Sequence, residues 1–165
     1  MDKVKTYAVL VCGIFGAMWG KLGALAWLIL ALLIFNVADW ITGSAASAVE
    51  GKGISSDAGR RGIVKKVGYW IEVGVCLVVD MLLVYALPEL SIGATVVTFT
   101  HPIVAPMVCV WLDLNEILSV IENLGRMGAP VPEWLSKFIT VLKNKVDVAG
   151  DDLADEYPNL NSKNQ

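Results

Sequence analysis

The sequence has few of the side chains from which most enzyme sites are built. It contains one histidine, His101, and three cysteines that all lie inside apolar runs: Cys12, Cys76 and Cys109. One histidine cannot serve both a histidine-dependent triad and a metal site. Cysteines in apolar runs are typical of small buried hydrophobic residues rather than of disulfides or metal ligands. Nucleophile-elbow, P-loop and dinucleotide-binding glycine motifs are missing as well. We therefore expect no catalytic residue, no cofactor and no metal.

Charge is also scarce. Only 18% of the 165 residues are charged, 56% are hydrophobic, and the mean hydropathy is +0.62. The apolar residues form long blocks instead of alternating with polar ones, as in membrane proteins. The few basic residues lie next to these blocks, which argues against nucleic-acid binding. We predict an all-α integral membrane protein. Residues 1–114 would form the transmembrane domain, 115–146 cytoplasmic amphipathic helices, and 147–165 an acidic, disordered tail.

The longest apolar run, from Leu22 to Val49, contains no lysine or arginine and a single acid, Asp39. At about 1.5 Å per residue a helix of this length crosses a hydrocarbon core of about 30 Å. An acid near the middle of a span costs about 2.5 to 3.5 kcal/mol, so Asp39 is expected to face protein or water. Three further residues share its helical face: Asn36, Thr42 and Gly43.

Two more runs, residues 62–87 and 91–114, are predicted to span the membrane. Within the first of them Glu72, Cys76 and Asp80 are spaced by four and predict one polar helical stripe. In the second, Asp113 lies on the less lipophilic face. Pro102 and Pro106 predict a kink near the middle of the membrane, because each removes a backbone donor.

Basic residues set the expected orientation. Four of them are expected at the membrane surface around the start of the second span: Arg60, Arg61, Lys65 and Lys66. The connection at residues 88–90 carries none, whereas the C-terminal part carries several. The positive-inside rule then places the first loop and the C-terminus in the cytoplasm.

The segment Thr6–Gly20 resembles a signal peptide, but bulky residues occupy the place of a cleavage site, so we expect it to be retained. It is predicted to be a short hydrophobic helix preceding three full spans, and a fourth span stays open as the alternative. Its Gly16 and Gly20 form a GxxxG pair of the kind that lets membrane helices pack closely.

After the third run the apolar spacing predicts an amphipathic helix at Asn115–Met127, a rigid linker at Ala129–Pro132, and a second amphipathic helix at Glu133–Val146. Both helices have one apolar side and one polar side. We expect them at the membrane surface or packed on other helices rather than across the bilayer.

The intramembrane acids allow two interpretations. Copies of the chain could assemble around an aqueous space that hydrates the acids. Alternatively, the acids could pair inside one bundle with groups such as Lys65, Tyr69 or Asn36. In the first case the residues facing a pore or a neighbouring subunit would be Asn36, Asp39, Thr42, Gly43, Glu72, Asp80 and Asp113.

Several of these stretches together resemble the toxin-secretion and phage-lysis holins, of the phage holin family 4 type. The stretch from Ala38 to Gly43 resembles the family's LDYITG segment, and Arg61 to Lys66 resembles its basic loop leading into GI-KK. Asp80 matches the acid of the second span. The stretch from Asn115 to Leu124, followed by Gly128 to Pro132, is similar to the family's NEGLSILENL and G-P-IP ending.

The likeness runs from about Leu22 to Phe138 in the right order and spacing. The chain departs from the pattern at Trp40, where tyrosine is usual, at Ile117, where glycine is common, and by extra length at both ends.

The resemblance implies a homo-oligomeric protein of the bacterial cytoplasmic membrane that forms lesions at a set time. The lesions would release an endolysin, a toxin or other cargo without a signal peptide, and an antiholin is a further expected partner besides membrane lipids. Two other functions stay open: a self-contained channel or transporter subunit, and a non-pore scaffold or antiholin-like regulator.

Overall fold

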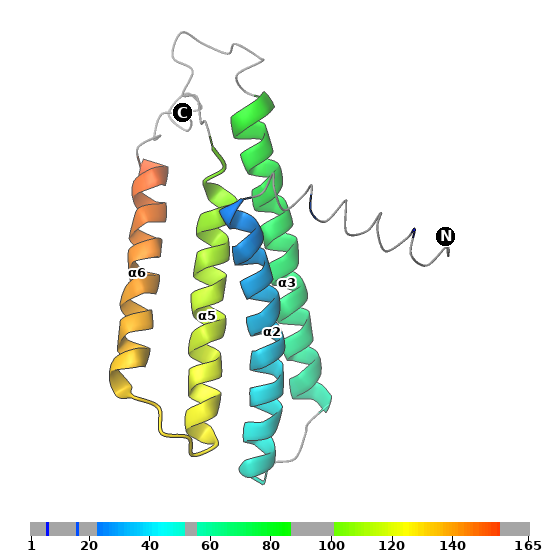
Figure 1. The fold of residues 1–165 in the computed structure, drawn as a ribbon, viewed down its shortest axis with the longest axis vertical. Helices are drawn as coiled ribbons and strands as arrows, with labels where there is room; N and C mark the ends of the chain where they lie inside the picture. The colour runs from blue at the N-terminus through cyan, green and yellow to red at the C-terminus, as the bar shows by residue number, and fades with distance from the viewer. Residues whose placement is uncertain (1–5, 7–15, 17–22, 52–55, 87–100, 156–165) are drawn as a thin grey trace, which may run out of the picture.

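The computed structural model describes residues 23–51, 56–86 and 101–155, together with Thr6 and Gly16. The described chain forms four long helices and one short π-helical extension (Figure 1). Their bounds are α2 (Ala24–Val49), α3 (Ser56–Met81), η1 (Leu82–Ala86), α5 (Val104–Arg126) and α6 (Glu133–Asp155). Along the long axis of the molecule, α2 and α5 run in one direction, and α3 and α6 run in the other.

Three helical segments are long and apolar enough to cross a membrane: Ala24–Val49, Gly62–Ala86 and Val104–Arg126. The chain is therefore a multi-pass membrane protein, and three spans are found among the described residues, as predicted. The expected N-terminal helix lies outside those residues, apart from Thr6 and Gly16. A Cβ atom added at Gly16 meets no atom within 4 Å, and its predicted partner Gly20 is not described.

The third span differs from the prediction. Helix α5 runs without a break from Val104 to Arg126, so the amphipathic segment expected at 115–127 is the second half of the spanning helix. Glu116 and Asn123 caused the error. Both side chains are polar, yet they are buried in the bundle with exposed fractions of 3% and 7%. A polar helix face looks the same in sequence whether it meets water or polar side chains of other helices.

Proline does not kink this helix. Pro106 is in the first turn of α5, and Pro102 precedes the helix. The first backbone N–H groups of a helix have no partner inside it, so a proline there removes no helical hydrogen bond. The predicted mid-membrane kink is therefore wrong, and residues 91–100 of the predicted run lie outside the described residues.

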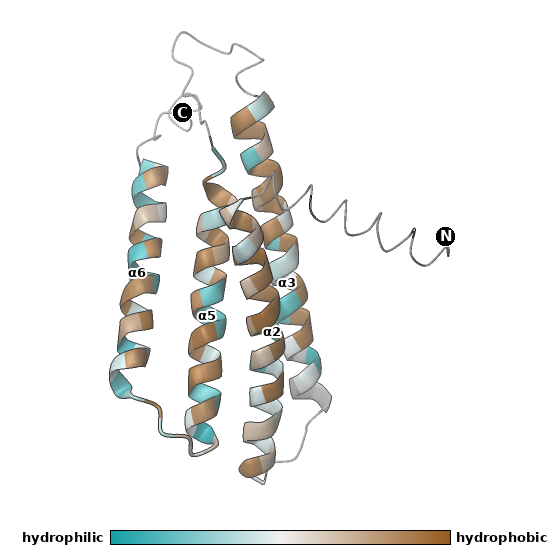
Figure 2. Cartoon of the chain, in the orientation of Figure 1, coloured by the Kyte–Doolittle hydropathy of each residue, from teal (hydrophilic) through white to brown (hydrophobic). Residues whose placement is uncertain are grey.

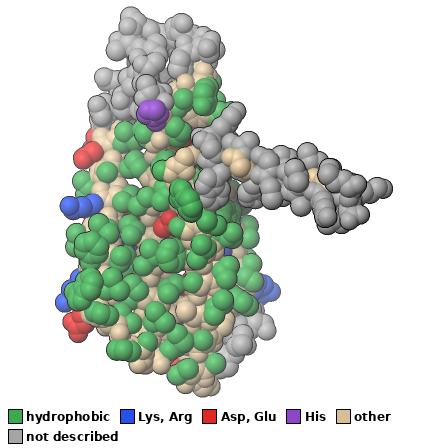
Figure 3. Space-filling view, viewed as in Figure 1, with side chains coloured by type: hydrophobic (Ala, Val, Ile, Leu, Met, Phe, Trp, Pro, Cys, Tyr) green, Lys and Arg blue, Asp and Glu red, His purple; other side chains and the backbone are tan. Residues whose placement is uncertain are grey.

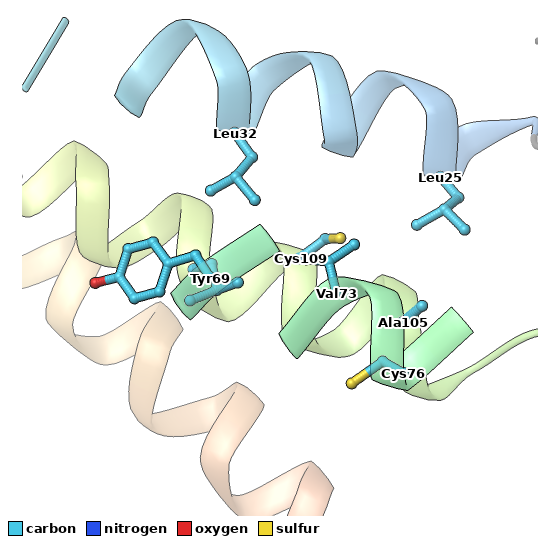
Figure 4. Packing of buried hydrophobic residues seen from close by; sticks show 8 residues of the cluster. Leu25, Leu32, Tyr69, Val73, Cys76, Ala105 and Cys109 are labelled. Carbon is cyan, nitrogen blue, oxygen red and sulfur yellow. The ribbon is translucent and has the colours of Figure 1, made fainter. Parts of the chain in front are cut away.

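Helix α5 is the central element, because it packs against α2, α3 and α6. Figure 4 shows Leu25 and Leu32 of α2 pointing toward residues of α3 and α5. The buried cluster comprises Leu25, Leu32, Tyr69, Val73, Cys76, Ala105, Cys109 and Leu112. Cys76 and Cys109 are free thiols within it, as expected of small hydrophobic residues.

Helix α6 lies along the other side of α5. Ile139 packs with Leu114 and Ile121, and the Nζ atom of Lys143 lies 4.7 Å from the centre of the Trp111 ring. Helix α6 also continues to Asp155, so the acidic segment expected to be disordered from residue 147 is helical over its first part. Figure 2 shows α2 as mostly hydrophobic and α6 as a mixture of hydrophobic and hydrophilic residues.

Candidate functional site

A cluster of charged and polar side chains joins the three spanning helices, and Lys66 is its centre. The Nζ atom of Lys66 lies 2.9 Å from Oδ2 of Asp39 and donates to Oδ1 of Asn36 at 3.1 Å. It also donates to Oε2 of Glu116. The side chain of Lys66 is 15% exposed. We call the following residues the charge cluster: Asn36, Asp39, Thr42, Lys66, Glu116, Ser119 and Asn123.

The position of Lys66 differs from the prediction, which placed it at the membrane surface. Two carboxylates, from α2 and α5, lie close enough to bind its ammonium group, so that group turns into the bundle. All three donors of the ammonium group have an acceptor. A buried charge is tolerated when opposite charges and hydrogen bonds compensate for its lost hydration. The neighbouring Lys65 is exposed, with Nζ 5.5 Å from the centre of the Tyr69 ring.

The remaining oxygen of Asp39 binds α5. Oδ1 accepts hydrogen bonds from Oγ of Ser119 at 2.5 Å and from Nδ2 of Asn123 at 3.0 Å. Nδ2 of Asn123 also lies 3.3 Å from Oγ1 of Thr42. A Cβ atom added at Gly43 would be 3.4 Å from that same amide nitrogen. The polar face predicted for the first span is therefore real, and within one protomer it contacts α5 and α3.

At one end of the bundle the charge cluster continues into a surface ion pair. Nε and Nη2 of Arg126 donate to the two carboxylate oxygens of Glu50 at 2.9 and 3.0 Å. Nη1 of Arg126 donates to Oδ1 of Asn123 at 2.9 Å. This bidentate geometry fixes the guanidinium group relative to the carboxylate. Arg126 thereby links the end of α2 to the charge cluster.

Asp80 belongs to a separate site at the start of α5. Its Oδ1 accepts from the backbone N–H groups of Ile103 and Val104 at 3.0 and 2.9 Å, and Oδ2 accepts from Ala105 at 2.8 Å. The carboxylate thus satisfies three N–H groups at a helix N-terminus, where negative charge is favourable. Asp39 and Asp80 were both predicted to face a pore or a neighbouring subunit. Each instead has partners inside one protomer, as in the alternative in which the acids pair within a single bundle.

The predicted stripe of Glu72, Cys76 and Asp80 divides between two environments. Cys76 and Asp80 are buried, whereas Glu72 is exposed. Glu72 lines a groove of about 250 Å³ together with Trp111 of α5 and Asp147 of α6. Four-residue spacing deviates from the helical repeat by about 40° at each step, so residues eight apart do not share one narrow face.

Asp113, the remaining predicted acid, is buried at 6% exposure. Among the described residues, no hydrogen-bond partner is found for its Oδ1 atom or for Nδ2 of Asn36. Arg60 is exposed near the start of α3. The side chain of Arg61 lies outside the described part of the structure.

Sequence reasoning missed the α5 half of the charge cluster: Glu116, Ser119 and Asn123. These residues recur at the spacing of one helix face, as do Asn36, Asp39 and Gly43 on α2. Two matching polar stripes on apolar helices were the available signal. The cluster opens to a groove of about 270 Å³ between helices, lined in part by Gly43, Ser47 and Gly62.

The profile of the bacteriophage holin family matches residues 16–144, which include the whole charge cluster. The chain belongs to the bacteriophage holin family. An uncharacterized protein of Listeria monocytogenes is 34% identical over 132 residues, which cover 79% of this chain and 83% of that protein. An uncharacterized protein of Listeria innocua matches to the same extent.

A third uncharacterized relative, from Halalkalibacterium halodurans, is 35% identical over 112 residues, or 68% of this chain and 75% of that protein. No solved structure matches the chain. Among the described residues of this holin-family chain, no group of three or more histidine, cysteine or acidic side chains could hold a metal ion.

Proposed function

We propose that this chain is a holin that assembles in the bacterial cytoplasmic membrane and opens lesions. The lesions release an endolysin or another cargo that has no signal peptide. Family membership is the observation that carries the proposal. The lipophilic bundle supports it, because its three spanning helices present exposed apolar side chains to the bilayer while Lys66, Asp80 and Glu116 are held inside.

Assembly of this chain is not driven by a lack of partners for Asp39 and Asp80. A protomer whose acids lacked partners would be driven to assemble by the cost of exposing those acids to lipid. Here Asp39 and Asp80 are satisfied within one copy. A single copy can therefore remain in the membrane as a closed bundle. Assembly then depends on contacts between copies and on their density.

Orientation is part of the proposal. The end of α2, the start of α3 and the α5–α6 connection lie at the same end of the bundle (Figure 1). The basic residues Arg60, Lys65 and Arg126 lie near this end, which supports its placement in the cytoplasm. A cysteine at position 89 should then react with an impermeant thiol reagent outside intact cells, and a cysteine at position 56 should not. The reverse labelling pattern would refute this orientation.

Expression in bacteria tests the proposed function. Production of the chain together with a cytoplasmic endolysin should stop growth abruptly and release the endolysin, whereas endolysin alone should not lyse the cells. In cultures that produce the chain without the endolysin, any general loss of cell integrity must come later than the endolysin release seen in the co-expressing cultures. Continued growth of both cultures, with the chain present in the membrane fraction, would refute the proposal.

An antiholin-like regulator is the second candidate, and the internal pairing of Lys66 with Asp39 and Glu116 favours it. A bundle whose buried charges are paired internally has no electrostatic driving force to open. This candidate predicts that the chain alone never lyses cells and that it delays lysis by a separate holin. The same endolysin experiment distinguishes the two functions.

A further inference from the structure

The exposed surface of the protomer has two different sides. The outward faces of α2 and α3 are predominantly apolar, with large side chains such as Ile34, Ile41, Val64, Ile71 and Val78 all more than half exposed. Hydrocarbon solvates such faces without cost. In Figure 3 most of the visible surface is hydrophobic, and charged atoms gather along the edge that α6 occupies.

Helix α6 carries a polar stripe at the spacing of one helix face. Its residues are Lys137, Thr140, Asn144, Asp147 and Asp151, and all five are exposed. Asp147 shares a groove with the exposed Glu72 of α3, so this acid extends the stripe onto a spanning helix. The adjacent exposed face of α6 carries four large hydrophobic residues, Trp134, Phe138, Val141 and Val148, together with the charged Lys145 and Asp152; we call the four hydrophobic residues the apolar stripe.

This polar stripe lies at the depth of the bilayer when α6 is packed on α5. Lys143 contacts Trp111, and a Cβ atom added at Gly150 would lie 3.8 Å from Cε of Met107. Both contacted residues belong to the spanning helix α5. Asn144 and Asp147, the two stripe residues between these contacts, are therefore level with the hydrocarbon core.

Such a position is unfavourable in lipid. Charged side chains that face hydrocarbon are costly, and α6 itself is not among the helices apolar enough to span. The α5 face beneath α6 is apolar, with Val110, Leu114 and Ile121, so lipid could cover it equally well. Packing of α6 on α5 within a membrane thus requires water on the polar side of α6.

We propose that α6 is the element that lines the aqueous lumen, with Glu72 of α3 beside it. This inference rests on the proposed holin function. In a single copy α6 lies on the cytoplasmic membrane surface with its apolar side in the headgroups. When copies surround water, α6 packs on α5 in the arrangement of Figure 1, and its polar stripe faces the lumen. The charge cluster stays inside each protomer.

The test is dye release from vesicles of phosphatidylethanolamine and phosphatidylglycerol that contain the purified full-length chain. Single cysteines are placed on the polar stripe, as Asn144→Cys and Thr140→Cys, and on the apolar stripe, as Val141→Cys and Val148→Cys. The parent chain for these variants carries Cys12→Ser, and its other two cysteines, Cys76 and Cys109, are buried, so this parent serves as the blank for a bulky charged thiol reagent. Modification should slow dye release severalfold for the polar-stripe variants and leave the apolar-stripe variants unchanged.

Equal slowing for both stripes, or no slowing for either, would overturn the lumen assignment. Dye release by the unmodified parent separates failure of the lumen assignment from failure of the proposed holin function. A parent that releases no dye refutes the lumen assignment and the holin function together. A second measurement uses the pair Met107→Cys and Gly150→Cys. A bifunctional thiol cross-linker should join α6 to α5 in leaking vesicles, and dye release should continue after cross-linking. A loss of dye release once α6 is joined to α5 would also overturn the proposal.

Discussion

The carboxylate of Asp80 binds the backbone of Ala105 across the interface between α3 and α5, with Oδ2 at 2.8 Å from the amide nitrogen. Its other oxygen binds two further N–H groups of the same helix start. The side chain is 3% exposed, so no bulk water replaces it when it is removed. One acid therefore fixes where α5 begins and how it docks on α3.

Replacement of Asp80 by alanine should destabilise the bundle by about 2 kcal/mol or more, because buried N–H groups at a helix start lose their acceptor. Asp80→Asn should cost less, since its amide oxygen still accepts. Unfolding in detergent with increasing sodium dodecyl sulfate, followed by circular dichroism, measures both. Val78→Ala is the control, since Val78 is 52% exposed on the same helix. Equal stability of Asp80→Ala and this control would contradict the capping role.

The adjacent lysines provide a matched pair. Lys66→Met leaves the buried carboxylate of Glu116 and the partly buried carboxylate of Asp39 without a cation and should cost about 3 to 5 kcal/mol. Lys65→Met removes an exposed charge and should change stability far less. The same unfolding titration compares them. A combined Lys66→Met and Glu116→Gln variant should recover part of the loss, and losses of similar size for the two single variants would disprove the buried ion pair.

Sequence reasoning located the first two spans, but it did not identify what each polar group binds. These two spans follow from local hydropathy, and residues 24–49 and 62–86 appear almost where the apolar runs predicted. The polar face of α2 follows from helical spacing. Partner choice depends on which helices are neighbours, and this is a property of the whole bundle. Lys66 near a helix start therefore looked like a surface residue, because its two acids come from 27 residues before it and 50 residues after it.

The same reason explains the error at α5. Glu116, Ser119 and Asn123 form a polar face that typically meets water in an amphipathic helix. In this bundle the facing surface of α2 is itself polar and contains Asp39, so the two faces satisfy each other. Only knowledge that α2 and α5 pack side by side could have extended the third span to Arg126.

Asp39 should affect lysis timing more than a lipid-facing residue does. Asp39→Leu removes the acceptor of Ser119 and Asn123 and one of the two acids that bind Lys66. Leu33→Ala alters a side chain that is 50% exposed on the same helix. Culture density after induction, with a co-expressed endolysin, gives the lysis time of each variant. Identical lysis curves would show that the charge cluster does not control opening.

Gly43 should tolerate only small side chains. The Cβ of alanine would contact Nδ2 of Asn123 at 3.4 Å, an ordinary packing distance, so Gly43→Ala should be nearly neutral. Gly43→Leu should force α2 from α5 and destabilise the bundle. Gly68→Leu is the control, because a Cβ at Gly68 meets nothing within 4 Å. The detergent titration should separate Gly43→Leu from both other variants, and a Gly43→Leu bundle as stable as Gly68→Leu would refute close packing here.

The ion pair between Arg126 and Glu50 should contribute little to stability but respond to charge exchange. Their side chains are 39% and 25% exposed, and pairs this accessible to solvent contribute about 0.2 to 1 kcal/mol. Arg126→Glu should cost more than that, because it places two acids together and removes the donor to Oδ1 of Asn123. Combining it with Glu50→Arg should restore the ion pair while the Asn123 bond stays lost. A double-mutant cycle in the detergent titration measures this coupling, and a coupling energy of zero would mean that the two side chains do not interact in the membrane-embedded protein.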